Sequence, residues 1–192
     1  MSTKRSAEQN KVDRSKVLDL IVDHGIDIFN RRLYLSSDVG EQMYDQVVKG
    51  LAILNQTANT DAITIHLHTG GGDLYSAMGI YDLIKSNKIP VDIICEAACM
   101  SAGTLILQAA RERISRPNTQ FMVHLGYESF SGEVGTARRI SEHYKTFELQ
   151  FLQIYADKME TTVQKLRKLF DRDTYMTAQT ALELSLIDRV EG

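Results

Sequence analysis

The hydrophobic positions of this chain change period several times along its length. Short apolar segments, most of them rich in β-branched residues, predict strands at residues 32–35, 62–67, 91–95 and 120–124. Between them, apolar residues recur three and four positions apart, which is the spacing of one helix face. This spacing predicts helices over residues 40–54, 74–88, 136–159, 161–170 and 177–186, and a further helix that begins within 97–104 and ends near 110.

Particular residues mark these elements. Met43, Val47, Leu51 and Leu54 form the inner stripe of the first helix, and the polar residues 36–38 precede it as candidate caps. Residues 91–95 are almost continuously apolar, so we expect a parallel strand that is covered on both faces. Residues 136–159 form the longest helix, and its apolar stripe is broad enough to contact two surfaces.

Strands alternate with helices through the first two thirds of the chain. This order predicts an α/β fold in which crossover helices connect parallel strands. We see no internal repeat or second hydrophobic core, so residues 17–192 are expected to form a single domain. Residues 1–16 are polar and carry charges of both signs, and we expect them to form a flexible N-terminal tail.

Composition and charge narrow the classes of partner. The formal net charge of −3 gives no basic surface for a nucleic acid. No apolar stretch is long enough to span a membrane, and the first residues lack the apolar core of a signal peptide. The two cysteines, Cys95 and Cys99, have neither CxxC spacing nor the number needed for a disulfide framework. We therefore expect a cytoplasmic protein with no nucleic-acid or membrane partner.

One segment has the pattern of a reactive serine. Residues 93–104 predict a strand, a tight turn and a helix, with small residues on both sides of Ser101. A serine at the start of a helix lies near unpaired backbone N–H groups, which suit the oxyanion formed when a carbonyl is attacked. On spacing alone, a serine that merely caps the helix is the more common explanation.

Three further segments carry candidate chemistry. Residues 69–73, Thr-Gly-Gly-Gly-Asp, follow a predicted strand, and glycines there let a backbone N–H approach a ligand. His124 ends an apolar strand, and Asp173 lies in a charged turn before the last helix. Taken alone, each has an ordinary structural explanation: a loose turn, a histidine at a strand edge and a solvated loop.

Metal and cofactor sites are not indicated. His66 and His68 alternate on a predicted strand and therefore point to the same face, but no third ligand is evident. The glycine-rich segment lacks the Gly-Lys-Ser/Thr of a phosphate-binding loop. We expect no metal and no organic cofactor.

Together, the four segments resemble the proteolytic subunit of the Clp protease family over residues 32–190. The Gly-rich turn and Met78-Gly-Ile-Tyr-Asp82 are similar to the family's glycine pair and its Met-Ala-Ile-Tyr-Asp helix. Residues 68–101 follow the family pattern without a gap. Residues 117–118 and 122–124 resemble its Pro-Asn and Met-Ile-His motifs. Residues 173–178 and 184–188 resemble its Asp-x-Phe-Met-Ser-Ala and Tyr-Gly-Leu-Ile-Asp motifs.

The resemblance implies roles for individual residues. Ser101 matches the nucleophile, His124 the general base and Asp173 the carboxylate that orients it. Gly72 and Ala102 match the donors of the oxyanion hole. We further expect residues 71, 126 and 127 (Gly71, Gly126 and Tyr127) to contact the substrate.

The resemblance also implies a fold, a reaction and an assembly. The fold is that shared by Clp proteases and crotonases, with stacked parallel strands, crossover helices and a long handle helix. The reaction is cleavage of peptide bonds by Ser–His–Asp acyl transfer, without ATP for short peptides. The assembly is two stacked heptameric rings that enclose the active sites, to which an AAA+ unfoldase feeds unfolded proteins.

Several alternatives stay open at this stage. The segment between Ser101 and His124 is about two residues shorter than is usual for the family, so an ungapped count back from His124 reaches Cys99. A Cys–His peptidase is chemically possible, although we prefer Ser101 because the match upstream of it has no gap. The remaining alternatives are a crotonase-type acyl-CoA enzyme, a serine protease that relies on a lysine, and a ring subunit without activity.

Overall fold

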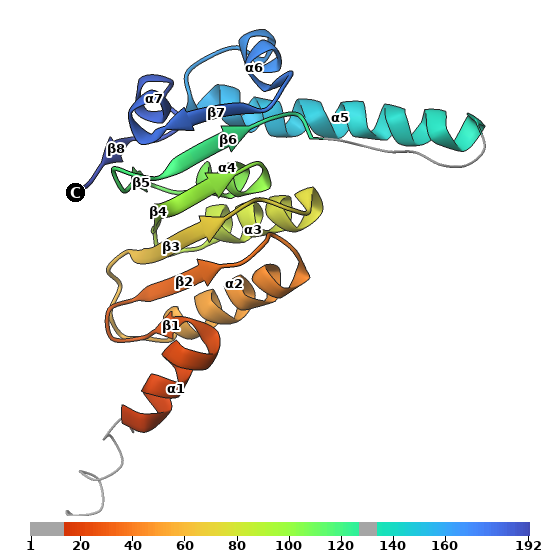
Figure 1. Cartoon of the computed structure of the whole chain (residues 1–192). Coiled ribbons are helices and arrows are strands. Elements are labelled where there is room, and N and C mark those ends of the chain that lie inside the picture. Colours follow the sequence, from red (N-terminus) through yellow and green to blue (C-terminus); the bar gives the residue numbers. More distant parts are fainter. Residues whose placement is uncertain (1–13, 127–133) are drawn as a thin grey trace, which may run out of the picture.

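A single sheet organises the chain. The computed structural model describes residues 14–126 and 134–192, and within these ranges eight strands join one sheet (Figure 1). The strands are β1 (Ile26–Asp27), β2 (Arg32–Ser36), β3 (Ile63–Thr69), β4 (Val91–Met100), β5 (Arg113–Ser115), β6 (Gln120–Val123), β7 (Thr174–Thr177) and β8 (Arg189–Val190). The helices are α1 (Arg14–His24), α2 (Glu41–Leu54), α3 (Leu74–Ser86), α4 (Ala102–Leu107), α5 (Val134–Lys158), α6 (Val163–Phe170) and α7 (Ala178–Glu183).

The sheet is mostly parallel, as the alternation of elements predicts. Strands β2, β3, β4, β5 and β8 follow one another as parallel neighbours, whereas β1 pairs with β2 and β7 pairs with β6 in antiparallel fashion. Strand β4 is long enough to pair with two strands along the edge opposite β3. Ile93–Cys95 pair with β5, and Ala98–Met100 pair with β6. The sheet therefore forks along β4, and β6 and β7 form a separate branch.

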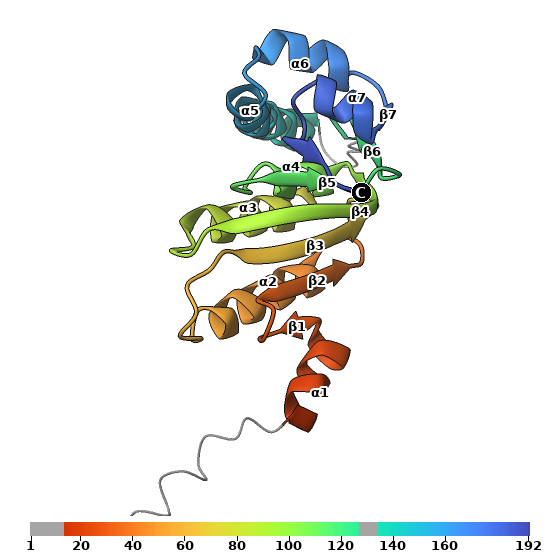
Figure 2. The same cartoon turned by 90° about the vertical axis from the view of Figure 1, so that its left-hand side faces the viewer.

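Helices cover one face of the main sheet. In Figure 2, α2 and α3 lie on the same side of β2, β3 and β4. Met43, Val47, Leu51 and Leu54 of α2 are all buried, which confirms the predicted inner stripe. The apolar residues of β3 that face the helices are also buried, whereas His68 on the opposite face is exposed. This one-sided burial produces the alternating pattern of the strand.

Four details of the sequence-based prediction were wrong. Strand β4 is not covered on both faces, because Asp92 and Ile94 remain partly exposed. No side chain caps α2, whose N-cap residue is Gly40. The predicted helix over 97–110 is shorter, because β4 continues to Met100 and α4 spans only Ala102–Leu107. Residues 174–177, predicted as part of a turn, form strand β7.

The ends of the domain also differ from expectation. The expected tail covers residues 1–16, but helix α1 begins at Arg14; residues 1–13 lie outside the described ranges. Helix α5, predicted over residues 136–159, is the longest helix described and extends well beyond the sheet (Figure 1). Thr177 caps α7 as predicted, since its side chain accepts a hydrogen bond from the N–H of Thr180.

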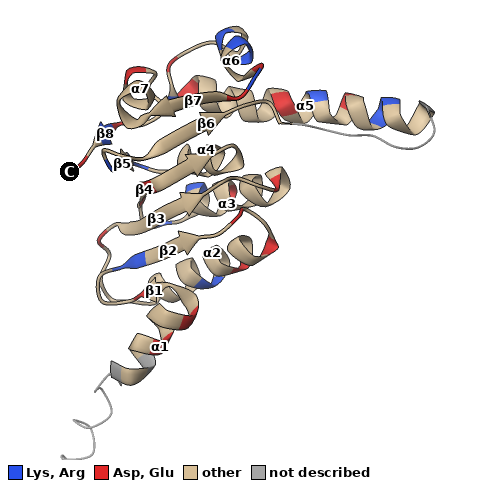
Figure 3. Ribbon diagram, viewed as in Figure 1, with Lys and Arg blue, Asp and Glu red and all other residues tan. Residues whose placement is uncertain are grey.

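Charged residues gather away from the centre of the sheet. Figure 3 shows acidic and basic residues mainly on helices and connecting segments, whereas most of the strand ribbon carries neither. Charged residues that are nevertheless buried include Asp27, Arg31 and Arg113. None of the described helices is both long enough and apolar enough to cross a lipid bilayer.

Candidate active site

Strand register brings Ser101, His124 and Asp173 together. Met100, at the end of β4, pairs with Met122 of the parallel strand β6, and the N–H of Ser101 donates to the carbonyl of Met122 at 2.8 Å. His124 directly follows β6, so it leaves the sheet at the same edge as Ser101. Because β7 is antiparallel to β6, with Val123 opposite Thr174, Asp173 precedes β7 at that edge. The fork in the sheet thus assembles three residues that are distant along the chain.

The side chain of Ser101 is hydrogen-bonded to the imidazole of His124 and does not cap helix α4. Its Oγ lies 2.7 Å from Nε2 of His124. The serine occupies the N-cap position of α4, but its side chain makes no capping hydrogen bond. Its φ is +49°, a value that is rare for a residue with a side chain and is typical of strained functional turns. The simple capping explanation is therefore wrong.

Asp173 lies at the other nitrogen of the imidazole ring. Its Oδ1 lies 3.0 Å from Nδ1 of His124. A carboxylate can only accept, so Nδ1 carries the proton and Nε2 is left as the acceptor for the hydroxyl of Ser101. The histidine side chain is 14% exposed and the aspartate side chain 35% exposed. The ring is therefore largely enclosed, whereas the carboxylate stays in contact with solvent.

The glycine-rich turn lies beside the serine. A Cβ at Gly71 would fall 2.6 Å from Cβ of Ser101, so only glycine permits this approach. Val39 donates to the carbonyl of Gly71 and accepts from the N–H of Asp73, each at 2.8 Å. Gly72 is bridged to Val39 in parallel register, so these two bonds turn its own N–H to the opposite side. Gly72 itself is exposed and lines the same cavity as Ser101.

A cavity of about 400 Å³ opens beside the serine and the histidine. Gly72, Ala102 and Gly126 line it together with Ser101 and His124. Its walls are mainly apolar and aromatic, and include Leu74, Leu105, Leu125, Phe151 and Tyr155. These walls come from α3, α4, α5 and the segment after β6. The cavity suits an apolar side chain held next to the hydroxyl group.

The expected substrate-contacting residues are only partly described. Gly71 packs on Ser101, and Gly126 lines the cavity with a φ of +89°. Tyr127 lies outside the described residues. Sequence reasoning did not identify Tyr155 and Thr104 as residues of the site. Their hydroxyl groups lie 2.7 Å apart in the core behind the cavity. Tyr155 lies on α5, close to the apolar stripe seen in the sequence, but nothing in that spacing shows its partner.

The position of Cys99 does not suit a nucleophile. Both cysteines are free and fully buried, and Cys99 does not line the cavity. The pKa of the Cys95 thiol is raised well above its usual range, mainly because the thiol is buried and in part because Cys99 is its neighbour. A thiol held protonated in the core behaves as a small apolar group.

The histidines of β3 make other contacts. Nδ1 of His66 lies 3.0 Å from Oε1 of Glu96, and its ring stacks on Tyr34 with centroids 4.9 Å apart. His68 accepts a hydrogen bond from the N–H of Ala98. Among residues 14–126 and 134–192, no group of three or more His, Cys, Asp or Glu side chains is arranged to hold a metal ion.

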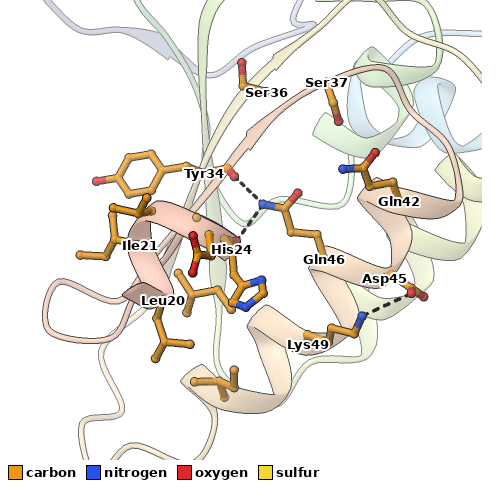
Figure 4. A pocket seen from close by; sticks show the side chains of 15 residues that line it. Leu20, Ile21, His24, Tyr34, Ser36, Ser37, Gln42, Asp45, Gln46 and Lys49 are labelled. Carbon is orange, nitrogen blue, oxygen red and sulfur yellow. Dashed lines mark hydrogen bonds and ion pairs between the residues drawn. The ribbon is translucent and has the colours of Figure 1, made fainter. Parts of the chain in front are cut away.

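A second cavity, of about 600 Å³, lies between α1, β2 and α2 (Figure 4). The amide of Gln46 donates to the backbone carbonyls of His24 and Tyr34 along one side of it. Leu20 and Ile21 line its apolar part. Ser101, His124 and Asp173 do not line this cavity, which separates it from the candidate active site.

Comparisons with known proteins point to one family. A family model described as Clp protease matches residues 23–192. A protein of Deinococcus radiodurans named ATP-dependent Clp protease proteolytic subunit is 27% identical over 175 residues, which cover 88% of this chain and 86% of that protein. A protein of Treponema denticola named ATP-dependent Clp protease proteolytic subunit 2 is 28% identical over 165 residues, which cover 83% of this chain and 81% of that protein.

Proposed function

Because this chain belongs to the Clp protease family, we propose that Ser101, His124 and Asp173 are the catalytic triad of its peptidase activity. The chain is a serine-type peptidase, the proteolytic core of a Clp-type protease. The observation that carries the residue assignment is the hydrogen-bonded line from Ser101 Oγ through the imidazole of His124 to the carboxylate of Asp173, with links of 2.7 and 3.0 Å. These distances are those of a nucleophile, a base and an orienting group.

The proposed reaction proceeds by acyl transfer. His124 Nε2 takes the proton of Ser101 as Oγ attacks the carbonyl carbon of a peptide bond. The carboxylate of Asp173 stabilises the imidazolium that forms. The imidazolium then gives its proton to the leaving amine, the C–N bond breaks, and an acyl-enzyme remains. Water, activated by the same imidazole, hydrolyses this ester and regenerates the serine.

Backbone N–H groups supply the oxyanion hole in this proposal. The N–H of Gly72 is directed away from its bridge to Val39. Ala102 is the first residue of α4, and the first N–H groups of a helix have no acceptor within the helix. Both residues line the cavity that contains Ser101. Two such donors hold the negative oxygen of the tetrahedral intermediate, a contribution worth about 10²–10³ in rate for each donor.

The substrate is a peptide or an unfolded protein. The apolar cavity receives the side chain before the scissile bond, while Gly71 and Gly126 leave room for the substrate backbone. We also propose the assembly typical of the family: a homo-oligomer of two stacked heptameric rings, with an AAA+ unfoldase delivering proteins. The two buried, reduced cysteines fit a reducing compartment, and we propose the cytoplasm.

Two alternatives lose support. A ring subunit without activity would not need the aligned Ser101–His124–Asp173 bonds. A crotonase-type acyl-CoA enzyme typically relies on carboxylates and has no use for an activated serine. The Clp protease family match favours the peptidase over the crotonase-type enzyme.

Labelling of the serine tests the assignment. A fluorophosphonate should modify Ser101 of the full chain, as located by peptide mapping, and Ser101→Ala should abolish turnover of a fluorogenic peptide. Cys99→Ala is the matched control and should keep activity, while native mass measurement should show all three proteins in the same assembly. Activity retained in Ser101→Ala and lost in Cys99→Ala would transfer the nucleophile to the cysteine.

A further inference from the structure

A chain of buried hydroxyl groups connects the long helix α5 to the backbone of Ser101. Thr104 Oγ1 lies 2.7 Å from the carbonyl oxygen of Ser101 and 2.7 Å from the hydroxyl of Tyr155. Thr104 and Tyr155 are only 1% and 3% exposed. The N–H of Thr104 also donates to the Ser101 carbonyl, at 2.9 Å. One threonine therefore holds this carbonyl through two hydrogen bonds.

The direction of these bonds follows from their donors. A carbonyl only accepts, so the single hydroxyl proton of Thr104 goes to Ser101 O. The proton between the two hydroxyl groups must then come from Tyr155. Burial raises the pKa of Tyr155, which keeps this donor protonated. The order is Tyr155 to Thr104 to Ser101, and each donor supports the next.

The Ser101 carbonyl belongs to the same peptide plane as the N–H of Ala102. In a trans peptide these two groups point in opposite directions within one rigid plane. A hydrogen bond that fixes the carbonyl therefore also fixes the direction of the N–H. That N–H is one of the proposed oxyanion donors, and Ser101 itself is held at a strained φ of +49°. Loss of the hydroxyl bond would leave only the N–H of Thr104 to hold this carbonyl, and the direction of the Ala102 N–H would be less well fixed.

Further contacts hold Thr104 in place. The amide of Gln108 donates to the Thr104 carbonyl at 3.0 Å, and Arg113 donates to the Gln108 side-chain oxygen at 2.8 Å. The ring of Tyr155 packs edge-on against Phe170, with centroids 4.9 Å apart. Both ends of the Tyr155–Thr104 pair are thus anchored in the core, which makes the pair a rigid support.

We propose that Thr104 and Tyr155 are positioning residues for catalysis: their hydroxyl pair holds the Ser101–Ala102 peptide so that the Ala102 N–H points at the oxyanion. This inference rests on the proposed function. It places one of the supports of the oxyanion hole on α5, far along the chain from the nucleophile. Neither side chain needs to touch the reacting atoms to act in this way.

Removal of each hydroxyl group tests the proposal. In Thr104→Val we expect kcat for a fluorogenic peptide to fall about tenfold, which is less than the loss of a whole donor, with KM within about twofold of the original. The affinity for a peptide boronic acid, whose tetrahedral adduct fills the oxyanion hole, should fall by a similar factor. Tyr155→Phe keeps the ring in the cavity wall and should lower kcat about threefold.

Two controls separate positioning from stability. Thr119 is also fully buried, and its hydroxyl donates to the Cys95 carbonyl at 2.9 Å, a bond that does not involve the Ser101–Ala102 peptide. Thr119→Val should lower the melting temperature as Thr104→Val does, yet leave kcat within about twofold of the original. Thr104→Ser keeps the hydroxyl and should restore kcat and boronic-acid affinity.

Each result has a defined meaning. A kcat for Thr104→Val equal to that of Thr119→Val, or an equal loss in Thr104→Ser, would overturn the proposal. If Thr104→Val fails to fold, Tyr155→Phe decides: unchanged kcat and unchanged boronic-acid affinity would overturn it. A failure of the proposed function is seen separately, because the unmodified protein would then escape fluorophosphonate labelling at Ser101.

Discussion

Replacement of Gly71 by alanine should slow the peptidase strongly, although it removes no proposed catalytic group. Gly71 has a φ of +100°, a region that residues with a side chain rarely adopt. An added Cβ would lie 2.6 Å from Cβ of Ser101 and 2.9 Å from the Met100 carbonyl. Ordinary carbon–carbon contact is about 3.5–4.0 Å. Ser101 or the glycine turn must therefore move by about 1 Å.

That displacement sets the size of the expected effect. A reacting group misplaced by about 1 Å can cost about 10²-fold in rate, so we expect kcat to fall by about two orders of magnitude. The strained backbone should lower the free energy of unfolding by about 1–3 kcal/mol. The collision with Ser101 should add about 1–3 kcal/mol, as overpacking does in other cores.

Gly126 provides the control for strain alone. Its φ is +89°, and an added Cβ would meet no atom of the described residues within 4 Å. Gly126→Ala should therefore show the loss of stability from strain without the loss from collision. Both variants are compared by urea unfolding at one fixed protein concentration, because association changes the apparent stability of an oligomer.

Turnover and labelling complete the assay. We expect Gly71→Ala to assemble normally by native mass measurement, to turn over peptides about 10²-fold more slowly and to react with a fluorophosphonate correspondingly slowly. A Gly71→Ala protein with kcat within about threefold of the original would refute the claim that this glycine sets the position of Ser101. A urea midpoint no lower than that of Gly126→Ala would refute the calculated collision.

Further predictions concern the triad, the cavity and the ion pair between Arg113 and Asp188. Asp173→Asn should lower kcat by about 10²–10⁴, because an amide can donate a hydrogen bond to Nδ1 of His124 and favour the wrong tautomer. Steady-state kinetics of this variant would check the expectation, and a change in KM alone would contradict it. Leu74→Trp should narrow the cavity beside Ser101. We expect kcat/KM to fall about tenfold or more for a peptide with leucine before the scissile bond, and much less for the same peptide with alanine there. Steady-state kinetics with the two peptides would measure this difference. Burial alone would raise the pKa of Asp188, but hydrogen bonds and charge from Arg113 outweigh it and lower that pKa. The ion pair therefore stabilises the fold above pH 3.8, the ordinary value, and loses its effect as pH falls through the lowered pKa. Because the carboxylate is 37% exposed and solvent screens the pair, Asp188→Asn should cost only about 1 kcal/mol at pH 7. The substitution should also flatten the acid side of the stability–pH curve measured by urea unfolding.

The main elements of the fold could be predicted because their signals are local. Helix α2 shows its buried stripe at Met43, Val47 and Leu51, and β3 shows its alternation, without reference to any other part of the chain. The short strands β1 and β5, with two and three residues, were not predicted, because segments so short carry no period. The extension of β4 to Met100 was hidden by small residues that are typical of a helix start.

Only those residues of the candidate site that belong to a family motif could be predicted from the sequence. Ser101, His124 and Asp173 follow from a family resemblance, since nothing in their separations along the chain indicates contact. The hydrogen bond between Thr104 and Tyr155 spans 51 residues and joins two helices, so it depends on how α5 packs on α4. Packing of this kind is decided by the whole core and leaves no local signal.

The choice between Ser101 and Cys99 shows what strand register adds to a count of residues. An ungapped count from His124 selects position 99, whereas the match upstream of the turn selects position 101. In the structure Cys99 lies within β4, paired with Phe121, and its side chain is buried in the core. Ser101 is the first residue past the strand, where its N–H still binds the carbonyl of Met122 and its side chain is released towards the imidazole. A residue inside a paired strand directs its side chain to one face of the sheet, and the side chain of Cys99 is buried. We therefore keep Ser101 as the proposed nucleophile, and we attribute the shorter segment between Ser101 and His124 to a deletion outside β4.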